Sequence, residues 1–174
     1  EYVKAPQWRS QLLVSPPLGA GMELEVRGRE VILSWDDSLA QEVTYVFQFG
    51  DAVVDVNEGN PAQNLLHAFS TGTELDTLSV RGQVRDALTG QPLDGFRVLL
   101  YSDAWPVDSL LAGALPSYVA TTDGEGRFEA GYLPKGGFRV LAVEDDNRNY
   151  AWDAGEMVAV GPASAKSQDT TFWD

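Results

Sequence analysis

The sequence has no cysteine and only one histidine, His67, among its 174 residues. Without thiols the chain has no disulfide framework and no thiolate that could act as a nucleophile or a metal ligand. One imidazole cannot form a zinc site of several histidines, and no G-x-S-x-G turn supplies a serine nucleophile to go with His67. These absences remove the common hydrolase and metalloenzyme sites, so we expect that the protein is not an enzyme.

Basic residues and long apolar runs are also scarce. Lysine and arginine total 12 against 26 aspartates and glutamates, so the formal net charge is -14. This charge repels phosphate backbones and anionic lipids, and we expect no nucleic-acid partner. No apolar run approaches the ~20 residues of a membrane-spanning helix, so direct membrane insertion is not expected either.

The pattern that dominates the sequence is alternation of apolar and polar residues with a period of two. It occurs in five stretches, residues 22–26, 43–49, 78–84, 96–100 and 138–142. Such alternation places one face of a strand on a core and the other in water, which is typical of antiparallel sheets. Turn signals rich in glycine and proline separate the stretches. The sequence therefore predicts an all-β protein built as β-sandwiches.

A domain boundary is predicted near residues 70–77, between the end of one predicted strand and the start of the next. It divides the chain into two modules, residues 1–74 and residues 75–174. The second module is long enough for a complete sandwich, whereas the first is short for one.

The first module carries three stretches in a fixed order, residues 12–17 (LLVSPP), 43–50 (VTYVFQFG) and 52–61 (AVVDVNEGNP), and it closes on FSTG at residues 69–72. In these stretches it resembles the bacterial Ig-like domain named after S-layer proteins. The resemblance covers most of residues 11–72 and implies an Ig-like sandwich.

The start of the first module departs from this family, whose members begin with a proline-rich turn and two strands that end in an F-x-E element. Here Glu1-Tyr2-Val3 stands where that element ends. The resemblance therefore implies a partial Ig-like sandwich that lacks its first strands. A missing strand leaves a sheet edge open, so we expect self-association through that edge. A monomer in light scattering would count against this expectation.

The second module has four characteristic stretches, residues 82–86 (GQVRD), 89–95 (TGQPLDG), 121–128 (TTDGEGRF) and 133–140 (LPKGGFRV). In these it resembles the carboxypeptidase regulatory-like domain, whose fold is a transthyretin-like (prealbumin) β-sandwich. The resemblance spans residues 78–145. It implies hairpins at the glycine-rich turns and a core that is filled from two sheets.

The combination of these two modules is similar to surface proteins of Gram-negative bacteria that are secreted or are outer-membrane lipoproteins. The resemblance implies a non-catalytic structural, adhesion or binding module that works outside the cytoplasm, with no catalytic residues to carry over. We expect a glycan or another surface protein as its partner. The alternative is a carbohydrate-binding module that depends on Ca²⁺ or is stabilised by it.

The sharpest local motif is the acidic segment of residues 145–156, DDNRNYAWDAGE. Counted from its first residue, oxygen-bearing side chains fall at positions 1, 3, 5, 9 and 12, and position 7 offers a backbone carbonyl. This is the ligand spacing of an EF-hand-type loop, and Ca²⁺ takes about this number of hard oxygen ligands. The predicted calcium ligands are Asp145, Asn147, Asn149, Ala151, Asp153 and Glu156.

Two features favour a different interpretation of this segment. Tyr150 stands at the sixth position, where the calcium loop has glycine for a sharp turn. The flanking residues have the pattern of strands, whereas an EF-hand has helices. An Asx-rich turn, in which the side chains bond their own backbone, explains the same residues. Both interpretations, a calcium site and a polar turn, stay open.

Two of the five tryptophans, Trp105 and Trp152, fall in predicted loops beside acidic residues. An aromatic ring can stack on a sugar while neighbouring carboxylates accept its hydroxyl protons, which makes these two the candidate ligand-binding residues. The alternative is that each ring packs down as a lid on the small core.

Overall fold

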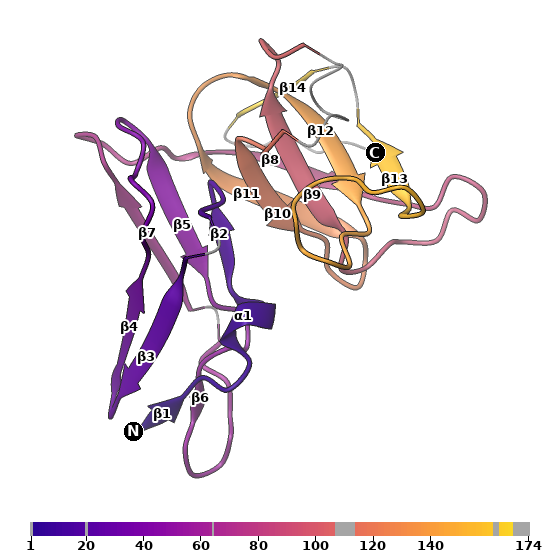
Figure 1. The fold of residues 1–174 in the computed structure, drawn as a ribbon. Coiled ribbons are helices and arrows are strands. Elements are labelled where there is room, and N and C mark those ends of the chain that lie inside the picture. The colour runs from indigo at the N-terminus through magenta and orange to yellow at the C-terminus, as the bar shows by residue number, and fades with distance from the viewer. Residues whose placement is uncertain (1, 20, 64, 107–113, 162–163, 169–174) are drawn as a thin grey trace. The chain divides into compact units, whose positions relative to one another are not determined.

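The computed structural model describes residues 2–19, 21–63, 65–106, 114–161 and 164–168 (Figure 1). Strands account for nearly all of the regular structure in this part of the chain, and its helix is the four-residue α1, Trp8–Gln11. The prediction of an all-β, sandwich-like protein is confirmed. The chain divides into two compact units, Glu1–Glu74 and Leu75–Asp174. None of the helices among the described residues is long and apolar enough to cross a membrane.

Unit 1 is built from short antiparallel strands. Its middle sheet has the strand order β2 (Leu13–Ser15), β5 (Thr44–Gln48), β7 (Leu66–Ser70). Its other strand pairs are β3 (Glu23–Arg27) with β4 (Glu30–Ser34), and β1 (Val3–Lys4) with β6 (Val54–Asp55). In β3 and β4 every second residue is partly buried and its neighbours are exposed, because only one face of this hairpin meets the core.

Aromatic side chains form the centre of the unit 1 core. Phe47 on β5 is buried, and the ring of Phe69 on β7 stacks on it with 5.9 Å between the centroids. Trp35 follows β4, and its ring lies 5.5 Å from that of Phe47 and 6.4 Å from that of Phe69. Trp35 therefore joins the hairpin to the middle sheet, and the two layers share one hydrophobic cluster.

The outer edges of unit 1 carry no further strand among the described residues. There, β7 pairs only with β5, and β4 pairs only with β3. On β7 the side chains of Leu66 and His67 are exposed. Unpaired edges of this kind are where chains associate, and self-association through them stays a prediction.

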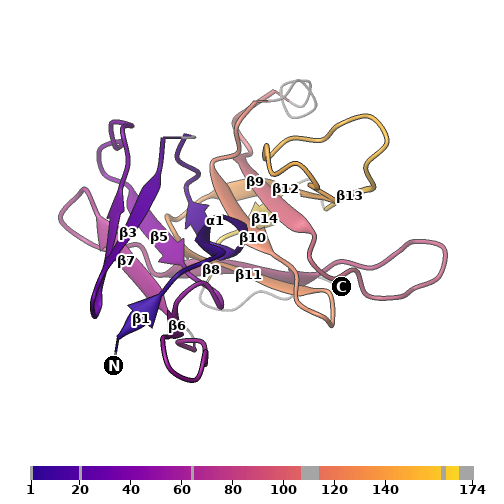
Figure 2. The same ribbon diagram turned by 60° about the horizontal axis from the view of Figure 1, so that its bottom comes forward.

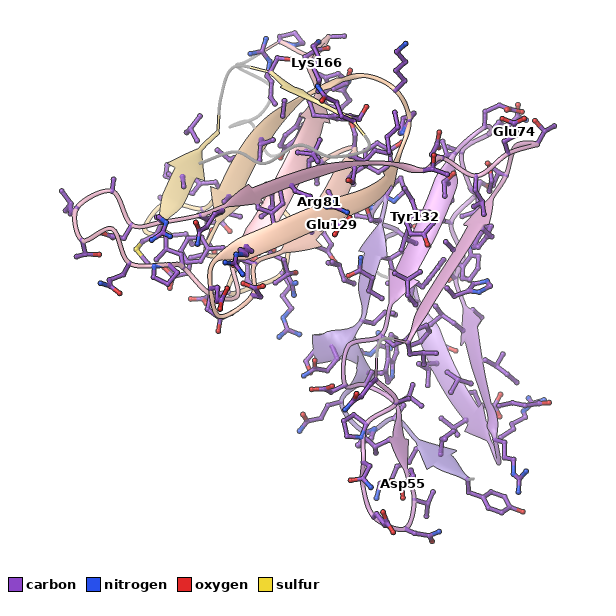
Figure 3. The ribbon with its side chains drawn as sticks, turned by 180° about the vertical axis from the view of Figure 1, so that it is seen from behind. Asp55, Glu74, Arg81, Glu129, Tyr132 and Lys166 are labelled. Carbon is purple, nitrogen blue, oxygen red and sulfur yellow. The ribbon has the colours of Figure 1, made fainter. Side chains whose placement is uncertain are left out.

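Unit 2 contains two antiparallel sheets in its described residues. The larger has the strand order β10 (Tyr118–Thr121), β9 (Arg97–Ser102), β12 (Gly137–Val143), β13 (Val158–Val160), with β14 (Ala165–Lys166) also paired to β12. The smaller pairs β8 (Leu78–Gln83) with β11 (Arg127–Leu133). Across this smaller sheet Arg81 and Glu129 form an ion pair of 2.6 Å (Figure 3).

The core of unit 2 lies between these two sheets and draws on both. Residues that alternate along each strand supply it, as the period of two predicts. The ring of Tyr118 on β10 packs edge-on against that of Phe138 on β12, with 5.8 Å between the centroids. The buried core residues include Val80, Val98, Leu100, Phe128, Leu133 and Phe138.

The larger sheet of unit 2 is also buried on the face away from this core. Leu99 and Tyr101 alternate along β9 with the core residues Val98 and Leu100, so they point to the opposite face, yet both are fully buried. The ring of Trp105, just after β9, lies 6.4 Å from the Tyr101 ring. Trp105 therefore packs against this second face of the sheet.

Candidate functional site

The acidic segment of residues 145–156 forms the connection between β12 and β13. The two strands are neighbours in the sheet, with Val143 opposite Val158, and the Glu144 N–H donates to the Met157 carbonyl at 3.0 Å. Figure 2 shows this loop leaving the ends of both strands. The segment therefore closes a β-hairpin, and strands flank it as its sequence indicates.

The oxygens of three side chains fold the first half of the loop. The carboxylate of Asp145 accepts the N–H groups of Asn149 at 3.0 Å and of Tyr150 at 3.2 Å. The side-chain carbonyl of Asn147 accepts the N–H of Asn149 at 3.0 Å, and that of Asn149 accepts the N–H of Ala151 at 2.8 Å. The side chains at positions 1, 3 and 5 of the motif thus accept hydrogen bonds from backbone N–H groups that follow them in the chain. These bonds hold the backbone in tight turns, as in Asx turns.

The second half of the loop is tied to the first through Asp153. One oxygen of its carboxylate accepts the Nδ2 groups of Asn147 at 2.7 Å and Asn149 at 2.8 Å. The N–H of Asp153 donates to the carboxylate of Glu156 at 2.9 Å. The structure therefore brings the side chains of five predicted ligands into one network, and Ala151 joins it through its N–H.

The backbone makes a sharp turn at the position that the motif reserves for glycine. Tyr150 has a φ of 58°, and Arg148 has a φ of 60°, so both are in the left-handed region. This conformation costs an L-residue about 1–2 kcal/mol. The tyrosine at position 6 therefore does not prevent the turn, and the hydrogen bonds of the Asp145 carboxylate hold the backbone in it.

Burial affects the pKa of the first predicted ligand, Asp145. Asp145 is buried, and the loss of solvation raises the pKa of its carboxyl above the ordinary value. The N–H groups of Tyr150 and Asn149 and the charge of Arg97 oppose this rise. The folded loop thus holds a carboxylate in a place where a positive charge nearby would be favourable.

Arg97 is a neighbour of the loop that sequence reasoning missed. It begins β9 opposite Val143, and its Nη1 donates to the hydroxyl of Thr121. Burial lowers the pKa of its guanidinium, and the charges of Tyr150 and Asp145 act in the other direction. The signal in the sequence is an arginine inside the apolar run of residues 96–101, and no motif connects it with the acidic segment.

The loop offers a calcium ion oxygen ligands of more than one chemical kind. Among the described residues, no group of three or more histidine, aspartate or glutamate side chains is placed to hold a metal ion. The loop instead offers carboxylates and carboxamides in one network, and Ca²⁺ accepts both kinds of ligand together with backbone carbonyls. A calcium ion would have to displace the two Nδ2 groups that donate hydrogen bonds to the Asp153 carboxylate.

The structure places the two candidate tryptophans at opposite ends of β9. Trp152 is in the loop beside the start of β9, and its Nε1 donates to the Glu156 carbonyl at 3.0 Å. Trp105 follows the other end of the strand, where it packs on Tyr101 while 39% of its surface stays exposed. Because a strand rises about 3.3 Å per residue, the two rings cannot form one stacking platform.

A second acidic segment, residues 51–60 in unit 1, is shaped by one carboxylate. The Asp55 oxygens accept the N–H groups of Glu58 at 2.5 Å and Asn60 at 2.7 Å (Figure 3). The hydrogen bond from Glu58 is the main cause that lowers the pKa of the exposed Asp55 carboxyl. This carboxylate therefore closes a polar loop.

Comparison of the chain with protein-family models, curated proteins and solved structures gives no match. The assignment of a site thus depends on geometry. Residues 145–156 join the predicted calcium ligands in a single hydrogen-bonded loop at one end of a β-sandwich, and this loop is the candidate functional site.

Proposed function

We propose that the chain is a non-catalytic structural, adhesion or binding module of a bacterial surface protein and that it works outside the cytoplasm. The observation that supports this proposal is the architecture, two all-β units that each have a hydrophobic core and need no disulfide. The candidate site lies in a loop at the end of a sheet, where sandwich folds commonly bind partners.

Protease treatment of intact bacteria that produce the protein tests its location. We expect the chain to be digested on intact cells, or recovered from the medium, while a cytoplasmic protein of the same cells stays whole. Western blotting of both proteins before and after lysis measures the difference. A chain that is protected until the cells are lysed would contradict the proposed location.

A second candidate function, a carbohydrate-binding module stabilised by Ca²⁺, is favoured by the geometry of residues 145–156. The Nδ2 groups of Asn147 and Asn149 supply partial positive charge to the Asp153 carboxylate, at the place where a cation would supply it. The indole of Trp152 is held in the same loop, so a sugar ring stacked on it would lie next to that cation.

We expect millimolar Ca²⁺ to raise the melting temperature of the protein. A cation that binds the folded loop and not the unfolded chain stabilises the fold by RT ln(1 + [L]/Kd), about 2.7 kcal/mol at 100 times its Kd. Asp145→Asn and Asp153→Asn each remove a ligand charge and should abolish most of the shift. Differential scanning calorimetry with and without Ca²⁺ measures the effect.

Asp146→Asn is the matched control for this experiment. Asp146 is next to the first predicted ligand and is exposed, and its substitution removes the same charge from a position that the motif does not use. It should keep the full Ca²⁺-dependent shift. A wild-type protein whose melting temperature ignores Ca²⁺, or an equal loss in Asp146→Asn, would leave only the Asx-turn interpretation.

A further inference from the structure

A groove with mainly apolar walls runs along β13 of unit 2. Its volume is about 440 Å³, and it is lined by residues 85–88, Leu93, Phe96 and residues 157–160. Figures 1 and 2 both show the loop that follows β8 on the same side of the unit as β13. The groove thus lies between a loop and β13, the strand at one end of the order β10-β9-β12-β13.

The walls of this groove expose apolar side chains that a folded protein normally buries. Leu88 in the loop after β8 is 97% exposed, and Val160 on β13 is 80% exposed. Met157 and Val158 are both more than 40% exposed. Single exposed hydrophobic residues are ordinary, but a contiguous group of them beside a groove indicates a contact surface.

Among the described residues, β13 pairs with β12 on one side and has no partner strand on the other. The Met157 carbonyl accepts the Glu144 N–H at 3.0 Å, and the Gly161 N–H donates to the Val140 carbonyl at 2.8 Å. In an antiparallel pair the residues between such bonds turn their N–H and C=O groups the other way. Val158 and Val160 therefore direct their backbone groups away from β12, and no described strand pairs with them there.

The charges near this edge favour one kind of occupant. Asp86 lines the groove, Asp94 follows the lining residue Leu93, and the N–H of Glu144 donates to the carbonyl of the lining residue Met157. Arg85 is the basic residue among the lining residues. A second copy of this chain would bring the same acidic groups together, and the net charge of -14 adds to that repulsion. A strand with basic residues at its ends meets an opposite charge instead.

We propose that the β13 edge is a docking site for an extended segment of a partner protein, with alternating apolar side chains and basic residues at its ends. The segment would add a strand to the larger sheet through the outward N–H and C=O groups of Val158 and Val160. Its apolar side chains would cover Val160 and Leu88. This proposal deepens the proposed role as a binding module, because it names the class of partner, and it is independent of the Ca²⁺ loop.

A synthetic peptide tests this proposal directly. The probe is an acetylated and amidated heptapeptide, Lys-Val-Thr-Val-Thr-Val-Lys, added to the ¹⁵N-labelled chain. We expect amide shifts concentrated at residues 157–161. Val160→Pro removes one outward N–H without removing a β12 bond, so it should weaken binding about tenfold or more. Val160→Ile keeps both the N–H and the apolar side chain and should bind as the wild type does.

Three results would overturn the docking site. One is the absence of shifts along β13 with the peptide in excess. Another is equal affinity of Val160→Pro and Val160→Ile, once thermal melting shows both to be folded. The third is equal binding of a peptide with glutamate in place of lysine, which would remove the charge argument. Light scattering that shows a dimer broken by Val160→Pro would identify a second copy as the occupant. None of these results depends on Ca²⁺ or on where the protein is located in the cell.

Discussion

Replacement of Leu100 by alanine is expected to lower the free energy of unfolding of unit 2 by about 2–5 kcal/mol. Leu100 is fully buried in the core, on the central strand β9. Its neighbours across the sheet are Tyr118 on β10 and Val140 on β12, and both belong to the same core. Truncation leaves a cavity that these neighbours cannot fill, because strands hold their backbones on both sides.

The matched control for Leu100→Ala is Leu88→Ala. The same atoms are removed in both variants, but Leu88 is 97% exposed in a loop. We expect the control to change the free energy of unfolding by no more than about 0.5 kcal/mol. Urea denaturation followed by circular dichroism measures both changes. Equal stability of the two variants would mean that Leu100 is not in a packed core.

The strands were predictable because their signal is local. The alternating stretch at residues 78–84 became β8 (Leu78–Gln83), and the stretch at residues 138–142 lies within β12 (Gly137–Val143). A period of two needs only neighbouring residues, so it is visible without knowledge of the fold. The pairing of β12 with both β9 and β13 depends on distant residues, and alternation alone could not predict it.

The burial of the second face of the larger sheet was missed, although β9 carries its signal. The alternating residues Val98 and Leu100 indicated one buried face. Leu99 and Tyr101 each follow one of them, and a run that is apolar at every position is typical of a strand buried on both faces. The period of two by itself indicates only one buried face of the strand.

The candidate site was predicted in its ligand spacing but not in its geometry. The spacing from Asp145 to Glu156 is a property of the sequence. The left-handed φ of Tyr150 is a property of the fold, because hydrogen bonds to the Asp145 carboxylate hold it. Arg97 comes close only because β9 pairs with β12, which connects residues far apart in the chain. Motif spacing contains no information about the φ of Tyr150 or about the position of Arg97.

Gly126→Ala is expected to destabilise unit 2 by several kcal/mol. Gly126 ends the turn that leads into β11, and its φ of 73° is in the left-handed region, which costs an L-residue about 1–2 kcal/mol. A Cβ at this position would lie 2.4 Å from the carbonyl oxygen of Val84 and 3.1 Å from the N of Leu93. Both atoms belong to the backbone, so relief requires a backbone shift, which adds about 1–3 kcal/mol.

The same turn supplies the control. Gly124 lies two residues earlier, and a Cβ there would meet nothing within 4 Å. The Asp123 carboxylate, which accepts the N–H groups of Glu125 and Arg127 at 2.9 Å each, is untouched by either substitution. Gly124→Ala should therefore stay within about 0.5 kcal/mol of the wild type. Urea denaturation of the two variants separates the backbone clash from the general cost of a side chain in this turn. If Gly126→Ala were as stable as Gly124→Ala, the close approach of the turn to Val84 and Leu93 would be wrong, and with it the register between β8 and β11.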